Sequence, residues 1–115
     1  MAEQRRSRRK KAPQTIQVTN SISGEVIGFV GNLSIDGMLL IANTPLVDDA
    51  LYQLRFSLRD APHHTSPIEV GAHLLWQDRT SMPGQTWTGF RCITMLESEM
   101  LQLRQWLDSP GGTYE

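Results

Sequence analysis

Apolar and polar residues alternate one by one along several short segments of this 115-residue chain, which is the period of a β-strand. The clearest segment is 52–58, where Tyr52, Leu54, Phe56 and Leu58 alternate with polar residues. A strand of this kind buries one face and exposes the other to water. Turn-forming residues interrupt the alternation at short intervals, which restricts the chain to small antiparallel sheets.

The alternation predicts six strands. They are expected at residues 15–18, 25–30, 38–42, 52–58, 68–77 and 87–94. In the fifth, Ile68, Val70, Ala72, Leu74 and Trp76 are expected to share one side, with Trp76 lining a pocket near the strand end.

Beyond residue 96 the apolar period changes from two to 3.6. Met100, Leu103 and Leu107 form the apolar stripe of a helix of about three turns, with Leu101 and Trp106 beside it. Six short strands followed by one amphipathic helix predict a mainly all-β fold. We expect a small antiparallel barrel with a C-terminal α-helix packed on it.

The formal net charge of −1 hides a strong asymmetry along the chain. Residues 1–11 carry six bases and one acid, a charge of +5, and the remainder carries −6. We therefore expect a mobile basic arm over 1–13 that nothing anchors to the core, a barrel and helix over 14–108, and a tail over 109–115. The arm could serve an anionic ligand, a nucleic acid, an anionic membrane or the acidic body itself.

No group of residues predicts catalysis or metal binding. His63 and His64 lie in a loop bounded by prolines, His73 lies on the polar side of a strand, and no metal-ligand spacing is present. Cys92 is the single cysteine, which fits a reducing compartment and a thiol that packs in the core. No apolar run approaches the ~20 residues of a membrane span. We expect a cytoplasmic protein without membrane insertion, which is not an enzyme and uses no metal or cofactor.

Residues 32–37, Asn-Leu-Ser-Ile-Asp-Gly, join two of the predicted strands. Asn32 offers an amide donor and an amide acceptor, and Ser34 offers a hydroxyl. Gly37 permits a positive φ or the close approach of a neighbour. This corner suits the edge of a planar heterocycle, and it suits a plain turn equally well.

The arginines of the basic arm have a chemistry of their own. A guanidinium is a planar fork that binds phosphate with two hydrogen bonds and stacks on purines. Arg5 and Arg9 stand four residues apart, so both could flank one ligand from the same side. From composition alone, a solvated basic tail is the simpler interpretation.

The two features together resemble a known signature. Arg5-x-x-x-Arg9, followed after 22 intervening residues by Asn32-x-Ser34-x-x-Gly37, resembles the bipartite motif of the PilZ domain family. That family consists of small bacterial six-stranded barrels that bind the second messenger cyclic di-GMP. The strand ending in Trp at 68–76, the Gly-Phe pair at 89–90 and the closing helix extend the resemblance over residues 5–108. It implies a PilZ-like antiparallel β-barrel with a C-terminal helix.

The resemblance also implies roles for individual residues. Arg5 and Arg9 would bind the phosphates of cyclic di-GMP and stack on or hydrogen-bond its guanines. Asn32 and Ser34 would bond a guanine edge or a phosphate, and Gly37 would keep the corner compact. The auxiliary contacts implied are Arg6, Arg8 and Trp76.

The sequence departs from the family pattern directly after Arg9. Lys10 and Lys11 stand where the family often has apolar residues that dock the arm to the barrel. Arg6-x-x-x-Lys10 is therefore an alternative frame for the arginine motif, although lysine lacks the bidentate fork.

The function implied is that of a cyclic di-GMP receptor and adaptor. Its arm would close on the ligand, an order–disorder switch, and signal to a protein effector in motility, biofilm or exopolysaccharide control. One alternative is an interaction module of the same fold that binds no ligand and acts in pilus or motility assembly. A nucleic-acid-binding barrel is a third hypothesis, disfavoured because a body of charge −6 repels a long polyanion.

Overall fold

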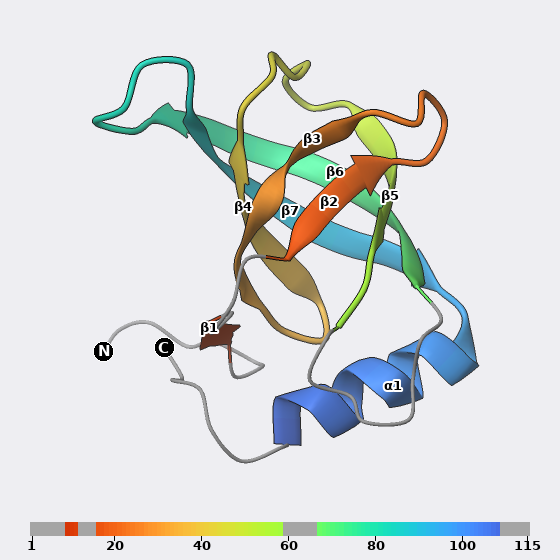
Figure 1. The fold of residues 1–115 in the computed structure, drawn as a ribbon. Coiled ribbons are helices and arrows are strands. Elements are labelled where there is room, and N and C mark those ends of the chain that lie inside the picture. Colours follow the sequence, from red (N-terminus) through yellow and green to blue (C-terminus); the bar gives the residue numbers. More distant parts are fainter. Residues whose placement is uncertain (1–8, 12–15, 59–66, 109–115) are drawn as a thin grey trace.

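The computed structural model describes residues 9–11, 16–58 and 67–108. Its elements are β1 (Lys10–Lys11), β2 (Gln17–Asn20), β3 (Val26–Leu33), β4 (Gly37–Ala42), β5 (Leu51–Phe56), β6 (Ile68–Arg79), β7 (Thr86–Met95) and α1 (Glu97–Asp108). Figure 1 shows the strands stacked above α1, which lies across one end of the sheet.

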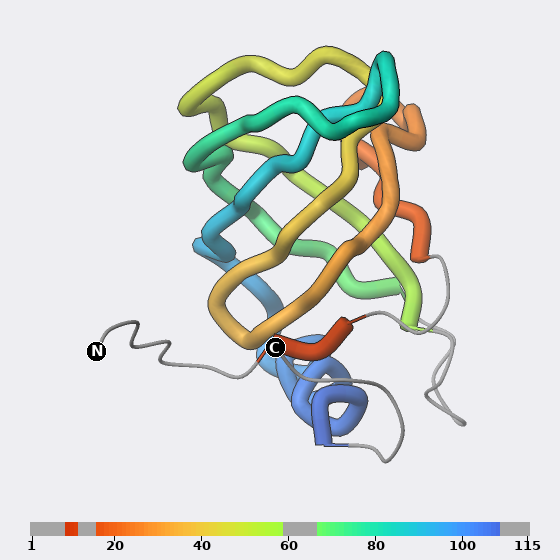
Figure 2. The backbone as a smooth tube through the Cα atoms, turned by 90° about the vertical axis from the view of Figure 1, so that its left-hand side faces the viewer, coloured from red at the N-terminus to blue at the C-terminus, as the bar shows by residue number. Residues whose placement is uncertain are grey.

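Six of these strands close into an antiparallel barrel. The order in the sheet is β3-β2-β5-β6-β7-β4, and β4 pairs back with β3 to complete the ring. Figure 2 shows the tilted strands winding around a common axis above the helix. The predicted fold, a closed six-stranded antiparallel barrel with a C-terminal helix, is confirmed.

β1 lies outside the ring and was not predicted. It pairs with β3, with Lys10 opposite Leu33 and Lys11 opposite Asn32. Two consecutive lysines show no apolar alternation, so the pattern that predicts the other strands gives no signal here.

Inward-facing side chains of the alternating strands fill the barrel. Val18, Leu40, Leu54 and Leu74 are each 0% exposed. In β6 the expected inner face is confirmed from Ile68 to Leu74. Removing this apolar surface from water is the main stabilising contribution to a barrel of this size.

The buried face of α1 differs from the predicted stripe. Gln102, Leu103 and Trp106 are the buried residues of the helix. Leu101, expected beside the stripe, is 50% exposed. Trp106 buries more apolar area than any other side chain of α1, so its position sets how the helix sits on the barrel.

Gly28 permits a close approach between β3 and β4. A Cβ atom at Gly28 would meet the backbone carbonyl of Ile41, which pairing across the ladder holds in place. We expect Gly28→Ala to lower the free energy of unfolding by about 1–3 kcal/mol, as overpacking usually does. Urea denaturation followed by circular dichroism measures the loss.

Gly71→Ala is the matched control. There the added Cβ would meet the Thr94 hydroxyl, and that exposed side chain can rotate away. A smaller loss is expected for Gly71→Ala, and equal losses in the two variants would contradict the backbone explanation.

Candidate functional site

The corner between β3 and β4 is held together by Ser34. Its backbone N–H donates to the Gly37 carbonyl at 2.9 Å. Its hydroxyl proton is shared between the Asp36 carboxylate at 2.9 Å and the Gly37 carbonyl at 3.3 Å. The side chain is 0% exposed. The hydroxyl therefore braces the corner from within and does not face the surface.

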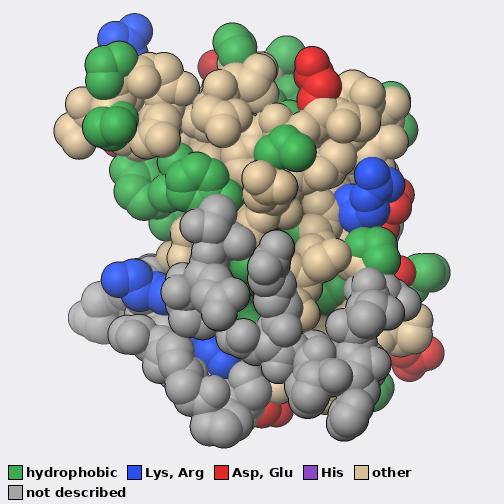
Figure 3. Space-filling model, in the orientation of Figure 1, with side chains coloured by type: hydrophobic (Ala, Val, Ile, Leu, Met, Phe, Trp, Pro, Cys, Tyr) green, Lys and Arg blue, Asp and Glu red, His purple; other side chains and the backbone are tan. Residues whose placement is uncertain are grey.

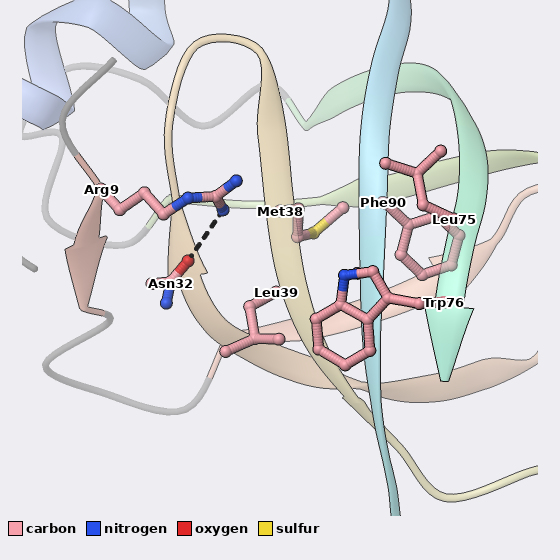
Figure 4. Close-up of a pocket in the computed structure, with 8 residues that line it drawn as sticks. Arg9, Asn32, Met38, Leu39, Leu75, Trp76 and Phe90 are labelled. Carbon is pink, nitrogen blue, oxygen red and sulfur yellow. Dashed lines mark hydrogen bonds between the residues drawn. The ribbon is translucent and has the colours of Figure 1, made fainter. Parts of the chain in front are cut away.

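Arg9 brings the basic arm onto this corner. Its Nη1 donates to the side-chain oxygen of Asn32 at 3.2 Å (Figure 4). A Cβ atom at Gly37 would lie 3.0 Å from Nη2 of Arg9 and 3.1 Å from the Phe90 carbonyl. Gly37 thus makes room for the guanidinium. Residues from both halves of the predicted motif are in contact.

Residues 9–11 correct the expectation that nothing anchors the arm to the core. Lys10 is 1% exposed, with its Nζ donating to the Trp106 carbonyl. Lys10 reaches α1 and Arg9 reaches the corner, so Arg9 is the residue of this pair that contacts Asn32. The choice between the Arg5–Arg9 and Arg6–Lys10 frames stays a prediction. The division of the chain at residue 13 stays a prediction. The predicted residues Arg5, Arg6 and Arg8 lie outside the described residues.

An open pocket of about 400 Å³ lies beside the corner. It is lined by Arg9, Asn32, Met38, Leu39, Leu75, Trp76, Gly89 and Phe90. In Figure 4 the Arg9–Asn32 pair lies on one side and Leu75 and Trp76 lie on the other, with Met38 and Leu39 between them. Its volume falls within the ~300–1,000 Å³ of small-molecule sites. One end suits an anion and the other suits a flat ring.

A register shift in β6 places Trp76 in this pocket. Leu74 pairs with Phe90, and the next pair is Trp76 with Gly89, which leaves Leu75 as an extra residue. The predicted inward direction of Trp76 is therefore wrong, and the side chain is 48% exposed. Its indole lies against Gly89, where a Cβ atom would meet Nε1. The expectation that Trp76 lines a pocket agrees with the structure.

A second register shift, in β3, turns Asn32 away from the barrel interior and toward Arg9, where its side chain is 3% exposed. Val30 pairs with Leu40 and Asn32 pairs with Leu39, so Gly31 is the extra residue. Leu33 then returns to the core at 1% exposure. Bulges of this kind redirect side chains and are common beside functional sites. Sequence reasoning missed both shifts, and with them the contribution of Leu75 to the pocket.

Cys92 lies next to the corner between β3 and β4, and its thiol has low reactivity. Its backbone N–H donates to the Asp36 carbonyl at 3.0 Å. Burial, and next the nearby Asp36 carboxylate, raise the pKa of the thiol to about 11, while Arg9 acts in the opposite direction. A thiol with this pKa stays protonated at neutral pH, as expected for a packing residue.

The surface around β1 is basic and partly apolar. In Figure 3 blue Lys and Arg side chains lie at the lower left, at the level of β1, with a green hydrophobic area above them.

Among the described residues, no cluster of His, Cys, Asp and Glu could hold a metal ion. His73 contacts Asp49 at 2.6 Å on the surface, and His63 and His64 lie outside the described part of the chain. In the described part of the chain, α1 is too short and too polar to cross a membrane, and no other helix qualifies.

Residues 3–109 match the model of the PilZ domain family, so the chain belongs to that family. Comparison with curated protein sequences gives no match. The fold is similar to that of the Bacillus subtilis inhibitor of motility MotI/DgrA, with a TM-score of 0.72, 16% identity, and coverage of 91% of this chain and 50% of the other. The chain thus spans about half the length of that protein.

Two structures of Escherichia coli YcgR are also similar. One is its PilZ domain with cyclic di-GMP, with a TM-score of 0.67, 18% identity, and coverage of 90% of this chain and 88% of that one. The other is YcgR in complex with cyclic di-GMP, with a TM-score of 0.69, 17% identity, and coverage of 91% and 45%. At these identities the similarity establishes the fold.

Replacing Ser34 tests its bracing role. Ser34→Ala removes the hydroxyl that holds Asp36 and Gly37, and we expect a loss of about 1 kcal/mol in the free energy of unfolding. Urea denaturation gives the value. Ser57→Ala, a change of the same type at an exposed position, is the control and should have little effect. Unchanged stability in Ser34→Ala would contradict the bracing role.

The raised pKa of Cys92 predicts slow alkylation. At pH 8 a pKa of about 11 leaves ~0.1% thiolate, against ~10% for the ordinary value of 9.0. We therefore expect iodoacetamide to react about a hundredfold more slowly with the folded protein than with the urea-unfolded chain. The folded state holds the thiol proton of Cys92 more tightly than the unfolded chain does. The free energy of unfolding is therefore expected to fall as pH rises from 9 toward 11. Mass spectrometry measures the rates, and similar rates would contradict the assignment.

Proposed function

We propose that this chain is a cytoplasmic receptor and adaptor, a binding module and not an enzyme, that binds cyclic di-GMP between Arg9 and Trp76. One observation carries the proposal. Arg9 and Asn32, 23 residues apart, meet in a hydrogen bond of 3.2 Å at the edge of a pocket whose other side is an indole. Membership in the PilZ domain family supports the same ligand class.

The chemistry of the pocket matches the two kinds of group in the ligand. Cyclic di-GMP carries two phosphates and two guanines. A guanidinium has five N–H donors, and the bond to Asn32 uses one of those on Arg9. In the proposal Arg9 donates to a phosphate, Asn32 bonds a guanine edge or a phosphate, and Trp76 stacks on a guanine. Arg5, Arg6 and Arg8 are proposed to add contacts from the arm.

Ser34 and Gly37 support the proposed site in different ways. With its hydroxyl buried and bonded within the corner, Ser34 acts by holding the corner in shape. Direct bonding of Ser34 to the ligand, as the motif implies, would require its buried hydroxyl to become exposed. Gly37 contributes the space that Arg9 occupies.

The proposed output is a signal to a protein effector. The ligand would settle the arm on the barrel and so change the surface that a partner meets. Residues 9–11 already lie on the barrel, so the proposed closure concerns the residues that precede Arg9. A solved relative is described as an inhibitor of motility, which favours motility as the process controlled; biofilm or exopolysaccharide control are further candidates.

Isothermal titration calorimetry tests the proposal. Saturable binding of cyclic di-GMP is expected, with linear dinucleotide, GTP and single-stranded DNA binding far more weakly. Arg9→Ala and Asn32→Ala should each weaken binding at least about tenfold, because each removes a hydrogen-bonding group that meets a charged ligand. Trp76→Ala should weaken it as well, through lost stacking.

Matched controls come from the opposite end of the barrel. Arg79→Ala removes the same charge, and Asn43→Ala the same amide, from a separate groove. Both should bind like the wild type. Heat from DNA that modest salt abolishes would favour a nucleic-acid-binding barrel instead. No heat from any nucleotide would favour an interaction module that binds no ligand.

A further inference from the structure

Lys10 is a buried cation directly next to Arg9. Its side chain is 1% exposed, which is rare for a lysine. The Nζ atom donates to the Trp106 carbonyl at 2.8 Å and lies 4.7 Å from the centroid of the Trp106 ring. The first residue of β1 is thus held by the end of α1, 96 residues further along the chain.

The Trp106 carbonyl that Lys10 bonds lies in the last turn of α1. α1 ends at Asp108, and the last four carbonyls of a helix have no partner within it. The residue four positions after Trp106 is Pro110, which has no N–H. α1 also has no basic residue in its last turn. Lys10 therefore supplies both the donor and the positive charge that a helix C-terminus favours.

Arg9 directly precedes β1 and Lys10 is its first residue, and the two side chains reach in different directions, as neighbours in an extended segment do. Arg9 reaches Asn32 and Gly37, and Lys10 reaches Trp106. Figures 1 and 2 both show β1 next to the lower end of the barrel and close to α1. The backbone position that Lys10 fixes therefore determines where the guanidinium of Arg9 can lie.

We propose that Lys10 is a positioning residue: its contact with Trp106 holds β1 in place, keeps Arg9 beside Asn32, and links the pocket to the last turn of α1. The ligand-dependent part rests on the proposed function. A ligand that stabilises docked β1 also stabilises the end of α1, because coupling between two sites is reciprocal. β1 stays docked with and without ligand, so the pocket is preorganised.

Acetylation of the wild-type protein tests the anchor without ligand and without a variant. Lys10 and Lys11 are the only lysines in the chain. With N-hydroxysuccinimide acetate, Lys10 should react at least about tenfold more slowly than Lys11 in the folded protein, since burial must first be relieved. In urea the two rates should be equal, as peptide mass spectrometry would show. Equal rates in the folded protein overturn the proposal.

Lys10→Met tests the link to α1. Methionine keeps an unbranched apolar side chain and removes the cation. Amide hydrogen exchange at residues 105–108 should become about tenfold faster without ligand, from the lost cap and cation–π contact. Lys11→Met loses the same charge from an exposed neighbour and should change exchange by less than about twofold. Unchanged exchange in Lys10→Met overturns the link.

A double-mutant cycle tests whether Lys10 acts through Arg9. Lys10→Met should weaken cyclic di-GMP binding about tenfold in the wild type and add nothing in the Arg9→Ala background. The ligand should also slow exchange at residues 105–108 of the wild type. Additive effects, or faster exchange with ligand, overturn the positioning role. If the wild type binds no cyclic di-GMP, the proposed function fails. The acetylation and exchange data without ligand then still show whether Lys10 holds β1 against α1.

Discussion

Two register shifts in the barrel determine where its binding chemistry lies. The extra residue Gly31 in β3 turns Asn32 to the outer face, and the extra residue Leu75 in β6 does the same for Trp76. Without them, strict alternation would point both side chains into the core. The closed ring of strands keeps the two shifted segments at a fixed separation, because β4 and β7 pair with each other between them. The pocket is therefore a property of the strand registers and not of a loop.

The sequence carries enough information for the barrel but not for these shifts. One-by-one alternation predicts six strands and the inner face of β6 from Ile68 to Leu74, since burial on one face imposes a period of two. The motif spacing also identifies Arg9 and Asn32, which the structure brings together. Leu75 is an apolar residue like many others in the strands. The alternation of apolar and polar residues therefore cannot show that it is the extra residue of the register shift. The partner of Lys10 is 96 residues away, and no local pattern connects the two.

Charge distribution favours a small anion over a long one at this site. The described basic residues near the corner include those of 9–11 and Arg91, which pairs with Gly37. They lie on a body that carries −6 outside residues 1–11. A compact ligand with one flat ring can meet Arg9 and Trp76 together and extend little beyond them. A longer nucleic acid strand would extend over a body that carries −6 outside residues 1–11, which repels further phosphates. The geometry and the electrostatics of the pocket thus both support the proposed class of ligand.

The location of Lys10 has consequences for how such a ligand could send a signal. Pulling β1 away from α1 would break the hydrogen bond between the Lys10 ammonium and the Trp106 carbonyl and the contact of that ammonium with the indole. A hydrogen bond from a charged donor is stronger than one between neutral groups, so this loss is costly. Release of β1 is therefore a poor output for a ligand with modest binding energy. Strengthening the existing contact between Lys10 and Trp106 is easier. It needs only a small difference in the affinity of the ligand for two nearly identical conformations. A partner that contacts the end of α1 would then respond to ligand in the pocket, because the ligand would make the last turn of the helix more ordered. The barrel itself would not need to move far.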